Sequence, residues 1–240
     1  MELEILRRAS AEEPAYVQRF SYQPRDTAET VATALTRLNE QPELRDVTGA
    51  PAAPIRWACS CLQKKCGACA MVINGLPKLA CDARLSAYRK TIRLEPLRKF
   101  PVVADLIVDR SVLYRNLADM KLWLQSRAEM DEQAARIGYE ASRCLQCGGC
   151  LEVCPNFSPE GPFAGMAAAV PLARLLEELP RGEKQALAET YRRRVYAGCG
   201  KSLACRNICP AKIPIDELLV NSNAIAVWKR LWKRKGAQDT

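Results

Sequence analysis

The cysteines are the feature that most constrains this chain of 240 residues, because twelve of them fall in three short segments and no histidine is present. Thiolates are soft ligands that suit zinc or iron–sulfur cores. Residues 1–10 carry charges from the second position and have no apolar run of the kind found in secretory leaders. We therefore expect a reducing compartment and thiolate–metal chemistry instead of disulfides.

The first cysteine segment has the spacing of a plant-type [2Fe–2S] ferredoxin site, C-x4-C-x2-C followed by a distant fourth cysteine. The predicted ligands are Cys61, Cys66, Cys69 and Cys81. Gly67 lets the backbone bend closely around a cluster. Cys59 stands two residues before this set and fits neither end of the spacing, so we predict a small buried side chain that binds no iron.

The second and third segments form an internal repeat with the bacterial ferredoxin spacing C-x2-C-x2-C-x3-C-P. In two-cluster ferredoxins the fourth cysteine of one run ligates the other cluster. The predicted [4Fe–4S] ligands are therefore Cys144, Cys147, Cys150 and Cys209. The predicted ligands of the third cluster are Cys154, Cys199 and Cys205.

Ser202 occupies the position where the third segment lacks its second cysteine. Three thiolates suit a [3Fe–4S] core, because the fourth iron lacks its strong ligand. A serine alkoxide could also bind iron, which would make this site a second [4Fe–4S] cluster. Zinc is the competing metal, but the uninterrupted second run does not divide into the paired C-x2-C steps of a zinc ribbon.

The pattern of apolar residues predicts strands around one helix in the first part of the chain. Alternation indicates strands at 3–6 and 16–22, and a helical period follows over 31–38 with Asp26 and Thr27 as candidate caps. Asn74-Gly75 predicts a hairpin joining 70–73 to 77–80. A closing strand is expected at 91–94. These elements predict a β-grasp [2Fe–2S] ferredoxin-like domain over residues 1–97.

The second part of the chain, residues 98–240, is predicted to be an all-α dicluster ferredoxin-like domain. Helical periods are expected over 102–110, 112–125, 131–139, 171–179 and 182–196. The fold class is therefore α+β. No apolar stretch reaches the length of a membrane span, and the best candidate, Met166–Leu179, is interrupted by proline and charged residues.

The formal net charge of +9 suggests nucleic acid or an anionic surface as a partner. Cluster binding weakens that suggestion, because eleven thiolates and the iron–sulfur cores would bring the charge to roughly +3. We therefore expect no nucleic-acid partner. A zinc-binding nucleic-acid module remains the alternative of a different class, and it predicts a colourless protein with salt-sensitive binding.

With these residues in hand, the chain resembles the iron–sulfur subunit of the succinate dehydrogenase/fumarate reductase family. The resemblance covers nearly the whole chain and is carried by CSCLQKKCGAC, MVINGLPKLAC, PLRKFPVVADLIVDRS, CLQCGGCLEVCP and CGKSLACRNICP. It implies an electron-transfer subunit with no catalytic residue of its own. Such a subunit lies between a flavoprotein subunit, which carries FAD and interconverts succinate and fumarate, and a membrane anchor that handles quinone. It also implies a peripheral position on the cytoplasmic side of the membrane.

Two positions depart from the succinate–ubiquinone members of that family, which have tryptophan after the first Cys-Pro and histidine after the first cysteine of the second run. Here Asn156 follows Pro155, and Gly200 follows Cys199. These departures favour a fumarate-reductase-like or menaquinone-linked member. The alternative is that the three clusters serve a different flavoprotein reductase without a quinone site, or a thiol-linked reductase. The segment 227–234, with two tryptophans among basic residues, could rest on a membrane interface or an anchor subunit.

Overall fold

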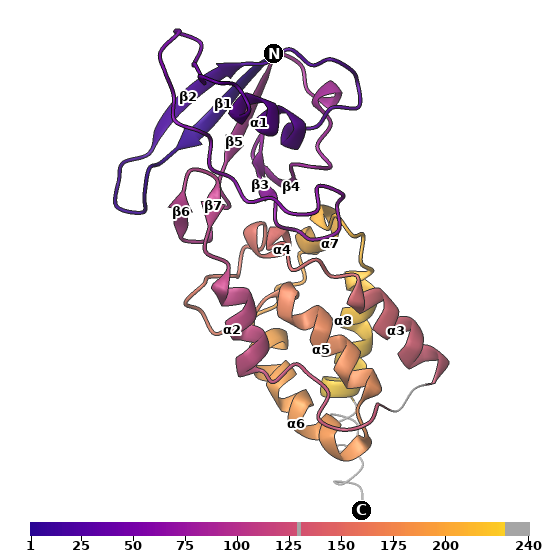
Figure 1. The fold of residues 1–240 in the computed structure, drawn as a ribbon. Helices are drawn as coiled ribbons and strands as arrows, with labels where there is room; N and C mark the ends of the chain where they lie inside the picture. Colours follow the sequence, from indigo (N-terminus) through magenta and orange to yellow (C-terminus); the bar gives the residue numbers. More distant parts are fainter. Residues whose placement is uncertain (129–130, 229–240) are drawn as a thin grey trace, which may run out of the picture. The chain divides into compact units, whose positions relative to one another are not determined.

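The computed structural model describes residues 1–128 and 131–228, which fall into two compact units (Figure 1). The first unit consists of Met1–Arg110 together with Leu145–Glu152, and the second of Ser111–Cys144 together with the chain from Val153 onward. Residues 98–110, which the sequence assigned to the helical domain, thus belong to the first unit. So does the short segment that carries Cys147 and Cys150.

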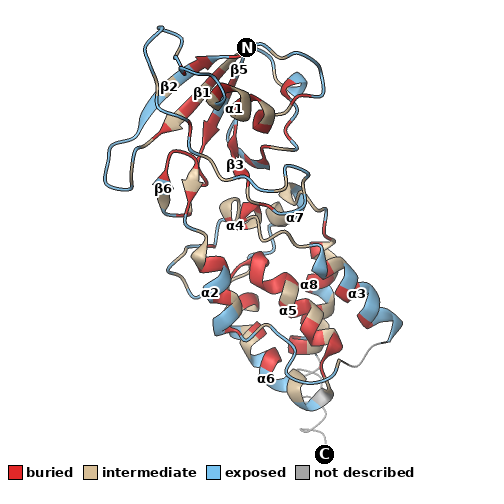
Figure 2. Cartoon of the chain, in the orientation of Figure 1, coloured by how far each residue is buried: buried red, intermediate tan, exposed pale blue. Residues whose placement is uncertain are grey.

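A five-stranded mixed sheet and one helix form the core of the first unit. The strands are β1 (Glu2–Arg7), β2 (Tyr16–Ser21), β3 (Ala70–Ile73), β4 (Leu76–Leu79) and β5 (Thr91–Glu95), in the order β2-β1-β5-β3-β4. The pair β1–β5 is parallel, and the others are antiparallel. Helix α1 (Val31–Asn39) buries Val31, Ala34, Leu35 and Leu38 (Figure 2). A one-turn 3-10 helix, η1 (Leu85–Ala87), precedes β5. The predicted sheet with its single helix is confirmed.

The N-terminal cap of α1 differs from the prediction. Thr30 caps the helix, because its hydroxyl accepts a hydrogen bond from the backbone N–H of Thr33 at 3.2 Å. Asp26 instead closes a turn ahead of the helix, where its carboxylate accepts from the N–H groups of Ala28 and Glu29. The expected caps at Asp26 and Thr27 are therefore wrong.

The segment predicted as a helix over 102–110 is a hairpin of β6 (Val102–Ala104) and β7 (Ile107–Val108). The helix prediction is wrong because this short apolar run pairs as two strands, in which Val102, Val103, Ile107 and Val108 favour extended backbone. Its turn residue, Asp105, has a left-handed φ of 44° and a buried carboxylate. That carboxylate accepts from the N–H groups of Arg8 (3.0 Å) and Arg56 (2.9 Å), which fixes the hairpin to the first unit.

The second unit is helical, as predicted. Its helices are α2 (Ser111–Asp119), α3 (Glu132–Ser142), α5 (Met166–Glu178), α6 (Arg181–Tyr191), α7 (Ala204–Ile208) and α8 (Ile215–Asn223), with π-helical turns η2 (Arg192–Tyr196) and η3 (Ala224–Trp228). Helix α5 is buried along most of its length (Figure 2) and contacts α2, α3, α6 and α8. It forms the core of this unit, and Pro171 lies in its interior.

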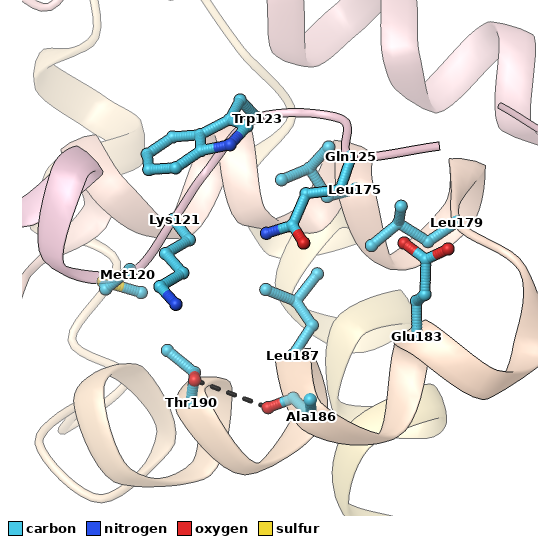
Figure 3. A pocket seen from close by; sticks show the side chains of 10 residues that line it. All are labelled: Met120, Lys121, Trp123, Gln125, Leu175, Leu179, Glu183, Ala186, Leu187 and Thr190. Carbon is cyan, nitrogen blue, oxygen red and sulfur yellow. Dashed lines mark hydrogen bonds between the residues drawn. The ribbon is translucent and has the colours of Figure 1, made fainter. Parts of the chain in front are cut away.

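In the second unit a cavity of about 180 Å³ is lined by the segment 120–125, which follows α2, and by residues of α5, α6 and the turn between them (Figure 3). Leu175, Leu179 and Leu187 give it an apolar floor, and Lys121 and Glu183 are charged residues of its lining. None of its lining residues is a cysteine, so the cavity is separate from the thiol sites.

Among the helices of residues 1–128 and 131–228, none is long and apolar enough to cross a membrane. Only Val227 and Trp228 of the tryptophan-containing tail are described. The rest of the predicted interface segment, 229–234, lies outside the described residues.

Candidate metal centres

The β3–β4 hairpin explains how a distant fourth cysteine joins the first site. Cys69 directly precedes β3, and Cys81 follows β4 by one residue, Ala80. Ala70 is paired with Leu79, and the N–H of Ala80 donates to the carbonyl of Cys69 at 3.0 Å. The turn between the strands is Asn74-Gly75, and both residues have positive φ, as a type I′ turn requires. The hairpin therefore returns the chain so that Cys81 lies beside Cys69.

Backbone N–H groups of the loop 61–69 point at the cysteine sulfurs. Cys61 Sγ accepts from the N–H groups of Gln63 and Lys65 at 3.3 Å, and Cys81 Sγ accepts from that of Lys64 at 3.3 Å. Leu62 and Lys64 have left-handed φ values of 52° and 60°. Left-handed residues within such a loop turn N–H groups inward and create a concavity that binds anions. The loop is thus preorganised for thiolates.

The cysteine thiols of this site lie close enough to alter one another's acidity. The N–H groups of Gln63 and Lys65 lower the pKa of Cys61 to about 7, and a hydrogen bond with the Cys66 thiol adds to the effect. Burial raises the pKa of Cys81 to about 11, and the neighbouring Cys69 and Cys61 act in the same direction. These contacts bring together the four predicted ligands.

Cys59 lies outside this arrangement. Its side chain is exposed, so the expected buried role is wrong. The backbone hydrogen bonds to sulfur described above are accepted by Cys61 and Cys81, and a further one from Ala68 is accepted by Cys66 at 3.5 Å. That Cys59 binds no iron stays a prediction.

Arg110 holds the cluster loop from the opposite end of the first unit's sequence. Its guanidinium donates to the carbonyls of Gly67 (2.9 Å), Ala68 (2.8 Å) and Ala70 (3.1 Å). A guanidinium presents several donors in a fixed plane, so one side chain can fix three carbonyls at once. No sequence pattern predicts this contact, because Arg110 lies far from the loop along the chain.

The cysteines of the predicted [4Fe–4S] site are divided between the units. Cys147 lies in the loop before α4 (Gly149–Glu152) and Cys150 lies within that helix, both in the first unit, whereas Cys144 and Cys209 belong to the second. Gln146 and Gly148 flank Cys147 with left-handed φ values of 48° and 84°. This backbone resembles that of the first cluster loop, and the shared ligation of one core by these four residues stays a prediction.

The three predicted ligands of the third cluster lie within the second unit and close to one another. Burial raises the pKa of the Cys205 thiol, and the nearby Cys199 and Cys154 act in the same direction. Ser202 is exposed and stands between Lys201 and Leu203, both with left-handed φ values of 56°. The structure thus brings together the three cysteines, and the identity of the core they bind stays a prediction.

Among the described residues, no group of three or more cysteine or acidic side chains is arranged to hold a single metal ion.

Comparisons with known proteins match both halves of the chain. A sequence family described as "2Fe-2S iron-sulfur cluster binding domain" matches residues 2–115, and one described as "4Fe-4S dicluster domain" matches residues 140–213. The succinate dehydrogenase iron-sulfur subunit of Bacillus subtilis (strain 168) is 34% identical over 230 residues, covering 91% of this chain and 89% of that protein. The chain belongs to the family of succinate dehydrogenase and fumarate reductase iron–sulfur subunits.

Other relatives agree with this assignment. The fumarate reductase iron-sulfur subunit of Escherichia coli O6:H1 is 30% identical over 174 residues, which are 68% of this chain and 70% of that protein. A chain of the Mycobacterium smegmatis Sdh1 complex in the apo form superposes with a TM-score of 0.75 over 94% of this chain and 95% of that chain. At 22% identity, that likeness shows the fold alone.

Membership in this family establishes the class of activity. The chain is an electron-transfer subunit of an oxidoreductase complex, with a [2Fe–2S] domain followed by a helical dicluster domain. The α+β fold class predicted from the sequence is confirmed. A [3Fe–4S] core beside the [4Fe–4S] core is consistent with the family.

Proposed function

We propose that this chain relays electrons between an FAD-containing subunit that interconverts succinate and fumarate and a membrane anchor that handles quinone. The observation that carries the proposal is the gathering of Cys61, Cys66, Cys69 and Cys81 in a loop whose N–H groups point at sulfur. This arrangement, together with two further cysteine runs in one chain, suits a series of one-electron carriers.

Each iron–sulfur core, when bound, accepts and releases one electron without bond chemistry on a substrate. The chain's own residues hold the cores and set their environment. Hydrogen bonds from backbone N–H groups to ligating sulfur stabilise negative charge there and thereby favour the reduced state. The loop 61–65 supplies such bonds to Cys61 and Cys81. Cys144, Cys147, Cys150 and Cys209 are the proposed ligands of the second core, and Cys154, Cys199 and Cys205 those of the third.

A menaquinone-linked or fumarate-reductase-like role is the finer proposal, and two neighbouring residues support it. Asn156 donates from Nδ2 to the carbonyl of Gly198 at 2.8 Å, and a Cβ on Gly200 would lie 2.9 Å from the same Nδ2. Asn156 therefore fills the space that a side chain at position 200 would need. The two departures from the ubiquinone-linked pattern thus occur together, as an altered quinone end of the subunit would require.

The alternative keeps the three clusters but assigns them to another flavoprotein reductase without a quinone site. The same altered residues, Asn156 and Gly200, motivate it. We place the subunit on the cytoplasmic face of the membrane as a peripheral component, by analogy with the family.

Anaerobic purification of the complex distinguishes the succinate/fumarate relay from a different flavoprotein reductase. We expect an FAD-containing subunit and an apolar anchor subunit to copurify, and succinate to reduce, or fumarate to reoxidise, the clusters. If a flavoprotein copurifies but neither succinate reduces the clusters nor fumarate reoxidises them, the result would favour a different flavoprotein reductase. Stoichiometric zinc with negligible sulfide would contradict the whole proposal.

A further inference from the structure

We propose that the backbone of Gly67 is the junction through which electrons pass from the [2Fe–2S] loop to the Cys147 loop, and that this junction needs a glycine. The inference rests on the proposed electron-transfer function. It concerns residues within the first unit only, and it assigns a positioning role to a residue that binds no iron itself.

The two loops touch at this point. A Cβ built on Gly67 would lie 2.6 Å from the carbonyl oxygen of Leu145 and 2.9 Å from the Cβ of Cys147. Such separations are shorter than real Cβ contacts, which begin at about 3.0 Å and are ordinary from 3.4 Å. Gly67 also has a left-handed φ of 74°. Close approach and backbone conformation therefore both require glycine here.

The contact joins two predicted cluster ligands by a short path. Gly67 follows Cys66 directly, and its backbone meets the backbone and Cβ of Cys147. The rate of electron tunnelling through protein falls exponentially with the distance between donor and acceptor. With both clusters bound, the electron lost by the first would be the one gained by the second, and no bond would form or break. A direct backbone contact thus gives this transfer a short route.

Residues of the first unit hold both sides of the junction. On the [2Fe–2S] side, Arg110 fixes the carbonyls of Gly67, Ala68 and Ala70. On the other side, Glu152 accepts a hydrogen bond from the N–H of Lys99 at 3.1 Å.

The Cys147 loop is also packed closely against its neighbours. A Cβ on Gly148 would lie 2.9 Å from Cζ of Phe100, and a Cβ on Gly149 would lie 3.8 Å from Cβ of Pro77. Neither loop can retreat without disturbing these contacts. A side chain at position 67 would clash with Leu145 and Cys147, so the two loops could accommodate it only by moving apart and giving up some of these contacts.

The test is Gly67→Ala in the purified holo-complex, with Gly75→Ala as a matched control. Gly75 has a similar φ of 82°, but nothing lies within 4 Å of its Cβ position. The control therefore carries the same backbone strain without the close approach. Cluster content is measured by iron and sulfide analysis, and coupling is measured by power saturation of the [2Fe–2S] paramagnetic resonance signal with and without reduction of the second cluster.

We expect Gly67→Ala to retain its clusters while the [2Fe–2S] signal loses part of its relaxation enhancement by the second cluster. We also expect electron transfer between the two clusters, followed by rapid freeze-quench, to slow several-fold. Gly75→Ala should match wild type in both measurements. Wild-type relaxation and transfer in a fully loaded Gly67→Ala complex would overturn the inference.

A second variant decides the matter if Gly67→Ala loses a cluster. Arg110→Lys keeps the positive charge but cannot fix three carbonyls at once. The relaxation enhancement and the rate of electron transfer between the two clusters should therefore both fall. This variant leaves Gly67 in place and so adds no backbone strain there. Unchanged coupling in that variant would then overturn the inference. Absence of either cluster signal in the wild-type complex would instead contradict the proposed function.

Discussion

Replacing Asp105 with asparagine should destabilise the first unit by about 3 kcal/mol. The Asp105 carboxylate is 1% exposed and lies 3.0 Å from Nε of Arg7, which is itself 2% exposed. The Asp105 carboxylate also accepts hydrogen bonds from the backbone N–H groups of Arg8 and Arg56. Asparagine keeps the shape and tolerates the left-handed φ of this position. The substitution therefore removes charge and one acceptor without adding backbone strain.

The magnitude follows from what the substitution leaves behind. Removing one partner of a buried ion pair typically costs about 3–5 kcal/mol, because the other charge remains buried. We take the lower end, because the asparagine carbonyl can still accept one of the two N–H groups. In a unit of this size, about 3 kcal/mol corresponds to a fall in apparent melting temperature of roughly 10 °C.

The stabilisation of the first unit by Asp105 should be present at neutral pH and lost in acid. Burial by itself raises the pKa of Asp105, but the Arg7 contact and the two N–H groups outweigh it and hold the pKa below its usual value. The stabilisation is therefore complete above the ordinary carboxyl pKa of about 3.9 and is lost as pH falls through the lowered pKa. Wild type and Asp105→Asn should differ most at neutral pH and converge in acid.

Anaerobic differential scanning fluorimetry of the holo-protein measures this effect. Glu13→Gln, which makes the same chemical change at an exposed position, is the control and should melt with wild type. A melting temperature for Asp105→Asn within the scatter of the control would refute the view that this buried carboxylate fixes the β6–β7 hairpin.

Two further predictions concern the cluster ligands. Cys59→Ser should leave the [2Fe–2S] spectrum intact, whereas Cys61→Ser, Cys66→Ser and Cys69→Ser should each shift or abolish it; loss of the spectrum in Cys59→Ser would mean that the ligand frame is wrong. The native oxidised protein should give the sharp resonance line of a half-integer-spin [3Fe–4S] core, and Ser202→Cys should remove it by supplying a fourth thiolate. The added negative charge should also lower that cluster's potential, and a native protein without the line would show that the site already holds four irons.

The gathering of Cys61, Cys66, Cys69 and Cys81 and most of the strands are predictable from the sequence because their signals are local. The spacing of thiolates along a loop determines which irons the loop can reach. The turn Asn74-Gly75 between two apolar segments predicts the hairpin that brings Cys81 to Cys69. The sequence does not decide the structure of the segment 102–110, because a short apolar run fits the helical and the strand period alike and only strand pairing selects between them. The sequence also does not decide the cap of α1, because Asp26 and Thr30 are both residues that favour the N-cap position.

The sequence alone does not predict contacts between residues that lie far apart along the chain. Arg110 meets the cluster loop, and Gly67 meets Cys147, only after the first unit has folded. The sequence predicts a bend at Gly67, but it does not predict that Cys147 lies against this residue. The buried pair of Arg7 and Asp105 likewise depends on tertiary packing, because charged residues are usually exposed.

Quantitative iron and acid-labile sulfide analysis of anaerobically purified protein tests the central claim most directly. Eleven ligating cysteines in three clusters predict about nine irons and about ten sulfides per chain, in a brown protein. Stoichiometric zinc with negligible sulfide would contradict the assignment of this chain as a three-cluster electron carrier.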